Sequence, residues 1–357
     1  MEQKNSNKTG IIFIPDISGF TKFVSTTEIE HSRKIIGELL EVLLDSNILE
    51  FVPSEIEGDA ILFYKMRDIP SLKEILTQIE EMFLNFHNYL IDITATNICT
   101  CGACKSAHNL SLKFIIHLGE VHELKIKQFN NIMGADVILA HRLLKNSVGL
   151  NEYVLFTEMY LNTQNEKDIN EYCVNLEHYD NFGEVKTYYL SLDYLREKIN
   201  KIPFQNFVPE TFNPDIEMKI FADPFSVYSV LIDNSKKMDW VPGIKRIIED
   251  NKLNRINHTH ICEFDMMDIE FTTSSAGTSG TKRFYSENIK VGKYINFTDE
   301  YLLVEDNGNT NLYYRIVKRM DNEAGILSGF LTNIFILMFI GKQKRALKKF
   351  KSLCEIK

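Results

Sequence analysis

The sequence has no excess of positive charge, no apolar leader and no repeats, and each absence excludes a class of protein. Its 40 lysines and arginines stand against 49 acidic residues, which gives a net charge of −9. This balance argues against a general nucleic-acid binder, because such proteins present a basic surface. The residues from Met1 to Asn5 lack the apolar region of a signal peptide, so we expect a cytoplasmic protein that is not secreted. Neither internal repeats nor low-complexity tracts occur.

Long apolar runs and a disulfide framework are also missing. The stretch 326–340 is rich in leucine, isoleucine and phenylalanine, but serine, glycine, threonine and asparagine interrupt it. It is shorter than the roughly 20 residues that span a membrane, although basic residues follow it. We expect a helix buried against a sheet, with membrane contact as the alternative. Three of the six cysteines lie between 99 and 104, unlike the spacing of secreted disulfide-rich proteins.

The length of 357 residues exceeds that of one ordinary domain and indicates two. Three of the eight prolines fall within 201–214, which suits a linker. We therefore expect one domain over 1–200, a linker over 201–214 and a second domain over 215–357. Helix-like and strand-like segments occur in both halves, so the expected fold class is α+β.

The first chemically informative stretch begins with an apolar run, Ile11 to Ile14, which reads as a short buried strand. The run stops at a single carboxylate, Asp16, and a Ser-Gly turn leads into helical spacing from Phe20. Such an acid can hold Mg²⁺, and the free amides of a first helical turn can hold phosphate oxygens. The alternative is a plain strand-to-helix turn in which Asp16 caps the helix.

A second acid, Asp59, stands in the turn signal Gly58-Asp59 before a strand-like run over 60–64. Between the two acids, residues 31–44 carry the apolar spacing of a helix. Strand, helix and hairpin in this order can bring Asp16 and Asp59 together on neighbouring strands. Two carboxylates at strand ends are what two-metal phosphoryl chemistry requires.

Four motifs in order, over about residues 8–195, resemble the class III nucleotidyl cyclases, the catalytic domains of adenylate and guanylate cyclases. They are Phe13-x-x-Asp16-Ile17-x-Gly19-Phe20-Thr21, Glu57-Gly58-Asp59-Ala60, His117-Leu118-Gly119-Glu120-Val121 and the helix from Gly134 to Leu143. The resemblance implies a ferredoxin-like α/β domain, a homodimer, and conversion of a nucleoside triphosphate into a cyclic nucleotide and pyrophosphate. It also implies two Mg²⁺ or Mn²⁺ ions at Asp16 and Asp59. The phosphates would lie at the amides of Ile17, Ser18, Gly19, Phe20 and Thr21.

The resemblance assigns further roles and shows one departure. The family places an asparagine and an arginine on the helix 135–144, both reaching a partner subunit. Arg142 matches the arginine and would stabilise negative charge in the transition state, unless it is only a solvated surface charge. Ile138 replaces the asparagine and cannot donate a hydrogen bond to the ribose. The base-selecting positions fall on Glu55, which resembles the guanylate-type acid, and on Asn131, which matches neither usual partner, so the nucleotide stays open.

A cysteine-rich loop follows a helix expected over 69–90. Cys99, Cys101, Cys104 and His108 have ligand spacing for tetrahedral Zn²⁺, and common cyclases lack this insert. Two alternatives remain: a redox or thiol-reactive loop, and a loop of reduced, partly buried thiols.

The second half begins with an alternating strand over 216–221 and a helix start at Asp223-Pro224. Strand-like runs follow at 257–264, 267–274, 281–287, 294–303 and 311–319, and a long apolar helix is expected over 324–353. With the Trp240-Val241-Pro242-Gly243 segment, this order resembles the START-like (polyketide-cyclase-like) helix-grip fold over about 210–357. The resemblance implies an apolar pocket for a lipid or another apolar ligand.

Two functions follow from these features. The first is a homodimeric nucleotidyl cyclase, which the two metal acids favour. The second is a catalytically weak or inactive nucleotide-binding sensor with a lipid-binding half, which Ile138 favours. A fold resemblance alone does not decide between them.

Overall fold

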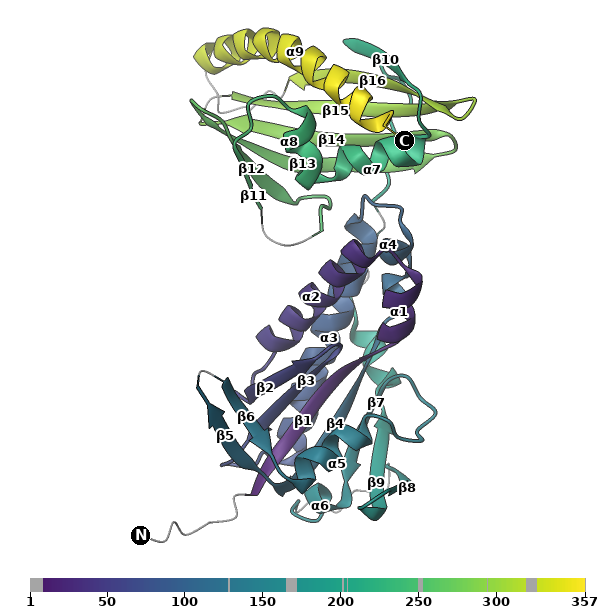
Figure 1. Ribbon diagram of the computed structural model, residues 1–357, viewed down its shortest axis with the longest axis vertical. Coiled ribbons are helices and arrows are strands. Elements are labelled where there is room, and N and C mark those ends of the chain that lie inside the picture. Colours follow the sequence, from purple (N-terminus) through teal and green to yellow (C-terminus); the bar gives the residue numbers. More distant parts are fainter. Residues whose placement is uncertain are drawn as a thin grey trace. The chain divides into compact units, whose positions relative to one another are not determined.

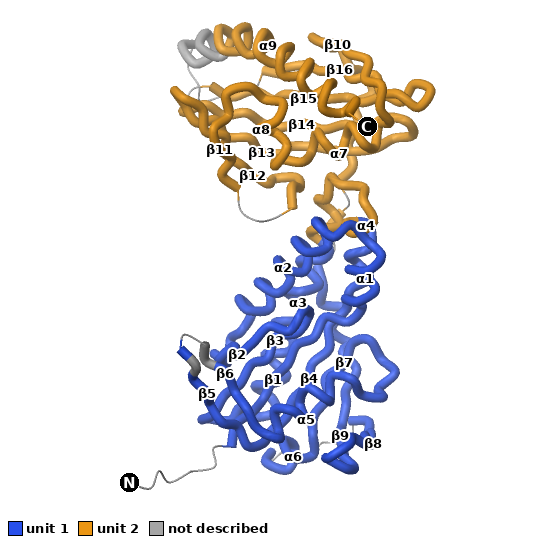
Figure 2. The backbone as a smooth tube through the Cα atoms, in the orientation of Figure 1, with its two compact units in different colours: residues 1–91, 105–201 blue, residues 92–104, 202–357 orange. Residues whose placement is uncertain are grey.

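The computed structural model describes residues 9–127, 129–164, 172–200, 202–203, 205–249, 253–293, 295–318 and 326–356. The chain forms two compact units (Figure 2). Unit 1 comprises residues 1–91 and 105–201, and unit 2 comprises residues 92–104 and 202–357. Parts of the expected linker, strands and last helix lie outside the described residues: Lys201, Phe204, Tyr294, Arg319 and 324–325.

Unit 1 is built on a sheet in the order β2-β3-β1-β4-β7-β9-β8 (Figure 1). The β4–β7 pair is parallel and the other pairs are antiparallel. A separate hairpin, β5 (His122–Ile126) and β6 (Phe129–Met133), stands beside it. The sheet strands are β1 (Thr9–Ser18), β2 (Val52–Glu57), β3 (Ala60–Lys65), β4 (Ser111–Glu120), β7 (Tyr153–Thr157), β8 (Cys173–Tyr179) and β9 (Gly183–Ser191).

Strand β1 buries side chains on both faces of this sheet, which explains its uninterrupted apolar run. On one face, Ile12 and Ile14 belong to a core with residues of helix α5 (Ala135–Leu143). On the other face, Phe13 stacks on Phe51 with ring centroids 5.0 Å apart. The remaining helices of this part of the chain are α1 (Phe20–Thr26), α2 (Ile29–Asp45), α3 (Leu72–Thr96), α4 (Gly102–Ser106), η1 (Ala107–Asn109), α6 (Glu158–Leu161) and η3 (Asp193–Lys198).

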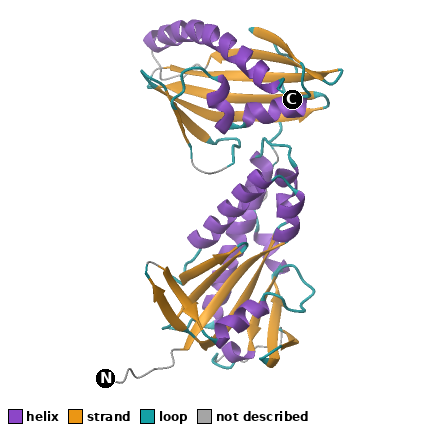
Figure 3. Cartoon of the chain, in the orientation of Figure 1, coloured by secondary structure: helices purple, strands orange, loops and turns teal. Residues whose placement is uncertain are grey.

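Unit 2 is mostly sheet, with seven antiparallel strands in the order β10-β16-β15-β14-β13-β12-β11 (Figure 3). The long helix α9 (Ile326–Cys354) packs on it, and Phe335 and Phe339 contact Phe297 of β15. The strands are β10 (Ile216–Ile220), β11 (Arg246–Ile248), β12 (Thr259–Glu263), β13 (Asp268–Ser279), β14 (Lys282–Val291), β15 (Ile295–Asp306) and β16 (Asn309–Lys318). The other helices are α7 (Pro224–Ile232), η4 (Asn234–Lys236) and α8 (Lys237–Trp240).

Asp223 caps α7 as the sequence predicts: its carboxylate accepts hydrogen bonds from the Phe225 and Ser226 amides, and Pro224 is the first helical residue. The cap holds the start of the helix that follows β10.

The segment 92–104 joins unit 2 through backbone hydrogen bonds. The Gln205 amide donates to the Ala95 carbonyl at 2.9 Å, and the Ile256 amide donates to the Thr96 carbonyl at 3.0 Å. Asn97 forms an isolated bridge with Arg255. Unit 2 therefore includes a piece of chain that precedes the rest of it by about one hundred residues, a separation visible in the unit ranges.

The mixed helix-and-strand composition agrees with the expected α+β class, and most expected elements are confirmed with small changes at their ends. The strand expected at 11–14 is longer, and β7, β8, β9 and β11 had no predicted counterpart. The ferredoxin-like and START-like assignments, and the domain boundaries, stay predictions. In the described part of the chain no helix combines the length and the apolarity needed to cross a membrane.

Candidate functional site

Asp16 lies near the end of β1, between its two neighbouring strands. It pairs in register with Ala60 of β3 and with Lys113 of β4. Only 8% of the residue is exposed. Asp16 does not cap the following helix, because α1 has Gly19 at its N-cap and no side chain caps it. The structure thus removes the plain-turn alternative for this acid.

Asp59 occupies the second position of the two-residue turn between β2 and β3, next to Asp16. Its carbonyl oxygen accepts a hydrogen bond from the Ile17 amide at 3.0 Å, which ties the turn to the end of β1. Gly58 supplies the left-handed backbone of this turn, with φ of 65°. Burial, together with the nearby negative charge of Asp16, raises the pKa of Asp59 to about 6. The two acids therefore form one electrostatic unit.

Lys113 is a third member of this site that the sequence motifs did not identify. Its ammonium group lies 3.0 Å from Asp16 Oδ2 and donates to the Leu144 carbonyl at 2.9 Å. The only signal in the sequence was a lone lysine in the otherwise uncharged first part of β4. Lys113 supplies a positive charge where the motifs predict a metal ion.

The carboxylates suit a hard divalent cation. Asp16 and Asp59 provide oxygen ligands that are partly desolvated and repel each other, and a shared cation relieves that repulsion. The Lys113 ammonium already neutralises part of this charge, so it competes with a metal ion for Asp16. The donor set fits Mg²⁺ or Mn²⁺, with Lys113 as the competitor.

The backbone amides expected to hold phosphate are only partly available. The Ile17 amide is engaged with Asp59. Gly19 adopts left-handed backbone with φ of 89°, and the first bond of α1 runs from the Phe23 amide to the Gly19 carbonyl. The amides of Phe20 and Thr21 precede that bond, so they are the ones available to a phosphate. Ser18 still belongs to β1.

Glu55 and Asn131, the expected base-selecting pair, lie together. The Asn131 amide nitrogen is 3.5 Å from Glu55 Oε2, and Ser54 donates to Asn131 Oδ1 at 2.8 Å. His141 of α5 joins them: Nε2 lies 3.3 Å from Glu55 Oε1 and Nδ1 lies 3.1 Å from Glu57 Oε2. The motifs did not assign His141 a role, although it directly precedes Arg142.

Arg142 and Ile138 are both exposed on α5, one turn apart. Among the described residues Arg142 forms no ion pair with a carboxylate. Other exposed apolar residues of unit 1 lie on β2, β5 and β6, and β6 contacts both α5 and β2. These exposed residues are Val52, Ile56, Leu124 and Met133.

A buried histidine fixes the junction of β4 and α5. His117 contacts Thr157 Oγ1 at 3.0 Å through Nδ1 and Asp136 Oδ1 at 3.2 Å through Nε2. Asp136 also accepts from the Glu120 amide at 2.6 Å, and the His117 contact lowers the pKa of Asp136. A Cβ on Gly119 would lie 2.2 Å from Asp136 Cγ, so only glycine allows this approach. The His-x-Gly-Glu motif therefore positions α5, which carries His141 and Arg142.

The three cysteines of the expected zinc loop are buried, and their sulfur atoms lie within 4.8 Å of one another. Hydrogen bonding with Cys101 and Cys99 raises the pKa of the Cys104 thiol. His108 is exposed in η1, and its assignment as a ligand stays a prediction.

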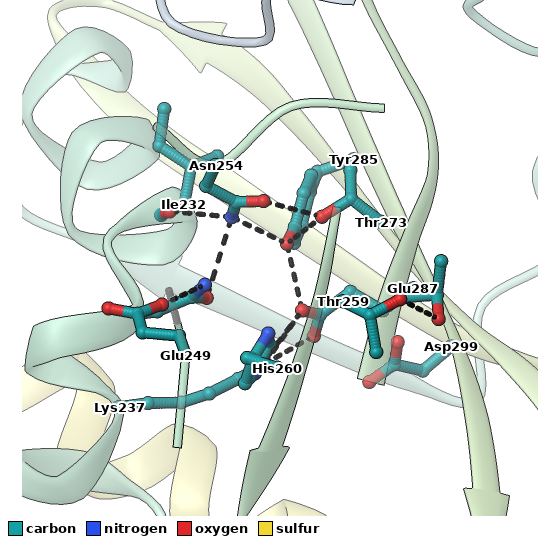
Figure 4. Close-up of polar contacts among 12 residues, drawn as sticks. Ile232, Lys237, Glu249, Asn254, Thr259, His260, Thr273, Tyr285, Glu287 and Asp299 are labelled. Carbon is teal, nitrogen blue, oxygen red and sulfur yellow. Dashed lines mark hydrogen bonds and ion pairs between the residues drawn. The ribbon is translucent and has the colours of Figure 1, made fainter. Parts of the chain in front are cut away.

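Unit 2 contains a buried charged network where an apolar interior was expected (Figure 4). Lys237 of α8 donates to both Glu287 oxygens at 2.7 Å and to His260 Nε2 at 3.0 Å. Tyr285 donates to Glu287 at 2.8 Å. Burial and the Lys237 charge lower the pKa of His260, which is consistent with a neutral ring that accepts from Lys237. The described residues give no support to an apolar ligand at this place.

Asp299 lies beside this network, in register with Glu287. Tyr301 donates to its Oδ2 at 2.9 Å, and Gln343 of α9 donates to Tyr301 at 2.7 Å. Burial, with the negative charge of Glu287 next in size, raises the pKa of Asp299 to about 8. This carboxyl is therefore protonated near neutral pH.

Comparisons with known proteins gave matches to part of the chain. A family described as "Protein of unknown function (DUF2652)" matches residues 36–153. The "Uncharacterized protein Rv2561/Rv2562" of Mycobacterium tuberculosis is 32% identical over 158 residues, covering 44% of this chain and 73% of that protein.

Two solved structures are similar to about half of the chain. The guanylate cyclase domain of RhGC from Catenaria anguillulae, in complex with GTP, matches at 16% identity and a TM-score of 0.37, covering 52% of this chain and 97% of that one. The adenylyl cyclase CyaB from P. aeruginosa matches at 15% identity and a TM-score of 0.37, covering 51% and 93%. Likenesses of this strength say nothing about activity, which has to be argued from the residues of the site.

Proposed function

Because this chain belongs to the family of the uncharacterized Mycobacterium tuberculosis protein Rv2561/Rv2562, whose name assigns no activity, we propose its function from the site itself. We propose that unit 1 binds a nucleoside triphosphate with divalent cations and converts it into a cyclic nucleotide and pyrophosphate. The observation that carries the proposal is the position of Asp59 in the turn directly before Ala60, the register partner of Asp16, where the negative charge of Asp16 helps to raise the pKa of Asp59.

Different residues of unit 1 are proposed to bind the metal ions and the phosphates. Asp16 and Asp59 hold Mg²⁺ or Mn²⁺, which supplies activation of the ribose 3′ oxygen and charge neutralisation of the triphosphate. The Phe20 and Thr21 amides bind phosphate oxygens. The Lys113 ammonium stays close enough to Asp16 to contact a phosphate oxygen once a metal ion takes over the carboxylate.

The Glu55, Asn131 and His141 cluster is proposed to bind the base. A carboxylate accepts two hydrogen bonds from guanine, from the ring N1–H and the neighbouring 2-amino group, whereas the same edge of adenine offers one donor, the 6-amino group, beside the acceptor N1. His141, in contact with Glu55 and Glu57, holds Glu55 in place. We therefore expect GTP to be the preferred nucleotide.

A second copy of this chain is proposed to complete the site. Arg142 is exposed on α5 and unpaired among the described residues, so it is available to a triphosphate held by another subunit. Strand β6 contacts α5, and exposed apolar side chains lie on β6 and on its neighbours β2 and β5, including Ile56 and Met133. An interface that covers them would bury apolar surface and bring Arg142 to the phosphates.

Two observations favour a second candidate function, nucleotide binding without turnover. Ile138 cannot hydrogen-bond to a ribose, and Lys113 partly neutralises the acids that should hold metal. Both features would reduce catalysis more than binding. In this case unit 1 acts as a nucleotide sensor.

The test incubates the purified chain with Mn²⁺ or Mg²⁺ and each of the four nucleoside triphosphates, and separates products by mass. We expect cyclic GMP with Mn²⁺, and none from Asp16→Asn or Asp59→Asn. Asp45→Asn, an exposed aspartate at the end of α2, is the matched control and should behave as the unaltered chain.

Calorimetry of nucleotide binding separates the two candidate functions. Tight Mn²⁺-dependent binding without any cyclic product would reject the cyclase and leave the sensor. Binding that is unchanged in both aspartate variants would reject both functions, because each requires metal at these acids.

A further inference from the structure

The loop after α3 and the first turn of α4 bring together three thiols within six residues. Cys99, Cys101 and Cys104 are each less than 10% exposed, and their sulfur atoms lie within 4.8 Å of one another. All three belong to unit 2. Three sulfur atoms at this separation surround a space that suits one metal ion, because Zn–S bonds are about 2.3 Å long.

Backbone amides of the loop point at the sulfur atoms. The Cys101 amide donates to Cys99 Sγ at 3.4 Å, and the Cys104 amide donates to Cys101 Sγ at 3.5 Å. Cys101-Gly102-Ala103-Cys104 turns directly into α4, which begins at Gly102. Hydrogen bonds from amides stabilise thiolate charge and orient ligands around a metal.

A positive charge also lies near the loop. Arg283 of β14 contacts Thr100 Oγ1 at 3.5 Å, and its guanidinium lies 5.8 Å from the ring centre of Tyr228. Tyr228 in turn interacts electrostatically with Cys99. A guanidinium at this place offsets the negative charge of a thiolate cluster.

The structure weakens the two alternatives for the loop. A thiol-reactive or redox role requires exposed sulfur, and these three cysteines are buried. Plain reduced thiols explain the burial, but they leave unexplained why three sulfurs converge and why two of them accept amide hydrogen bonds.

We propose that Cys99, Cys101 and Cys104 bind one Zn²⁺ as thiolates. Each thiol releases its proton to solvent on binding, and a fourth ligand from outside this trio, a side chain or a water molecule, completes the tetrahedron. The ion would fix the conformation of the loop that follows Ala95, Thr96 and Asn97. The backbone hydrogen bonds of these three residues join the segment 92–104 to the rest of unit 2. The site is structural and independent of the nucleotide site.

The first experiment uses the unaltered full chain, purified without chelator and free of any affinity tag. Elemental analysis should find about one zinc per chain, as a structural site requires. A mercurial reagent should react first with the exposed Cys173 and release the zinc only when Cys99, Cys101 and Cys104 react, which a colorimetric zinc indicator follows. Two results would overturn the proposal. One is a purified chain that contains no zinc and whose Cys99, Cys101 and Cys104 thiols all react, and the other is a chain that holds copper instead of zinc.

The second experiment compares single alanine variants of the three cysteines with Cys262→Ala. Cys262 is a buried cysteine of β12 in the same unit and outside the trio, so it controls for loss of a buried thiol. We expect zinc content to fall at least tenfold in each trio variant and to stay unchanged in the control. Unchanged zinc in all three would place the ion elsewhere and reject the site.

If a trio variant fails to fold, a third experiment on the unaltered chain takes its place. In it, Co²⁺ is substituted for the bound zinc. Bound Co²⁺ should show the intense near-ultraviolet charge-transfer absorption of cobalt–thiolate bonds. Its absence from cobalt-loaded chain would also reject thiolate ligation.

Discussion

The ion pair between Lys113 and Asp16 sets the charge of the proposed metal site before any cation binds. With Asp59 alongside, the group carries two carboxylates and one ammonium, and Asp59 has a raised pKa. A divalent cation must therefore displace the ammonium from Asp16 or share the carboxylate with it. Two predictions at the scale of single residues follow from this arrangement.

Replacing Lys113 by methionine should tighten Mn²⁺ binding. The variant keeps most of the side-chain volume and removes the competing charge, so Asp16 is free for metal. A partly buried ion pair of this kind is worth about 1 kcal/mol, which corresponds to roughly fivefold in affinity. Isothermal titration with Mn²⁺ at pH 8 measures the change, and Lys186→Met, on an exposed pair of β9, is the control. Weaker binding would show that Lys113 supports the metal site.

Metal affinity should fall as the pH is lowered through about 6. A proton on Asp59 competes with the metal, and the pKa of this carboxyl is raised to about 6 in the metal-free chain. Mn²⁺ titrations between pH 5 and pH 8 should therefore show a loss of affinity centred near pH 6. In Asp59→Asn, the remaining weak binding should lose this step, and a step that persists would assign the titration to another group.

The sequence identified part of this site because some of its residues fall in short motifs. Asp16 and Asp59 stand in such motifs, and the helix between them makes neighbouring strands a natural outcome. Lys113 and His141 were not identified, because the β1–β4 register determines the partner of Lys113 and the packing of α5 determines the partners of His141. No local sequence pattern shows this register or this packing. The Ile17 amide was expected to face a phosphate but is consumed by the Asp59 carbonyl. A hydrogen bond across strands is likewise invisible in sequence.

At the scale of elements, the close contact between β4 and α5 depends on Gly119, which has no side chain. Gly119→Ala would place a methyl group within 2.5 Å of three atoms of Asp136, so β4 and α5 must move apart. Overpacking of this kind costs about 1–3 kcal/mol. Urea unfolding followed by circular dichroism should show a lower midpoint for this variant.

Gly37→Ala is the matched control for that variant. Gly37 lies inside α2, and an added Cβ would meet no atom within 4 Å. Alanine raises helix propensity by roughly 1 kcal/mol, so the midpoint should stay or rise. An equal loss of stability in both variants would show that the β4–α5 approach has no special role.

The pairing of β14 with β15 buries Asp299 beside Glu287, and this environment raises the pKa of the Asp299 carboxyl. Its pKa is about 8 in the folded chain, against an ordinary value of 3.8. The unfolded chain releases this proton above about pH 4, so the stabilising contribution is present below pH 4 and declines until about pH 8. Asp299→Asn cannot titrate, and its stability relative to the unaltered chain should rise between pH 5 and pH 8.

Urea unfolding at several pH values checks this dependence. Asp239→Asn, an exposed aspartate of α8, should follow the unaltered chain at every pH. A constant difference between Asp299→Asn and the unaltered chain would mean that this carboxyl does not hold a proton.

Elements with a strong periodic signal were predicted well from the sequence, as in α2, α3 and the hairpin strands of unit 2. The β7 strand was missed because it is short and fully buried, so it shows no alternation. The β8 strand was missed because its side chains are mostly exposed or half-buried and of mixed polarity. The charged network around Lys237 was also unexpected, since its members come from α8, β12 and β14, far apart in the chain.

At the scale of the whole molecule, the proposed enzyme requires two chains for each site. Asp59→Ala and Arg142→Ala chains should each lack cyclase activity, because one loses a metal ligand and the other a transition-state contact. Mixed together, they form heterodimers in which one of the two sites is intact. Loss of one such contact costs roughly 10²–10³ in rate, so the recovered activity should exceed that of either parent clearly.

Native mass spectrometry should confirm that the heterodimers form. If they form from an otherwise active protein and no activity returns, the two residues serve the same chain and the shared site is rejected.

In the sheet of unit 2, the first strand, β10, pairs with the last, β16. Each strand from β11 to β16 pairs with its neighbour in the chain, whereas β10 pairs with β16, and Ile220 meets Thr310. During synthesis on the ribosome, the successive hairpins can close as soon as each second strand emerges. Strand β10 has to wait until β16 has been made, and an unpaired strand edge readily pairs with another chain. The interval between the translation of Ile220 and that of Thr310 is therefore a period in which the β10 strand of a nascent chain is open to pairing with another chain.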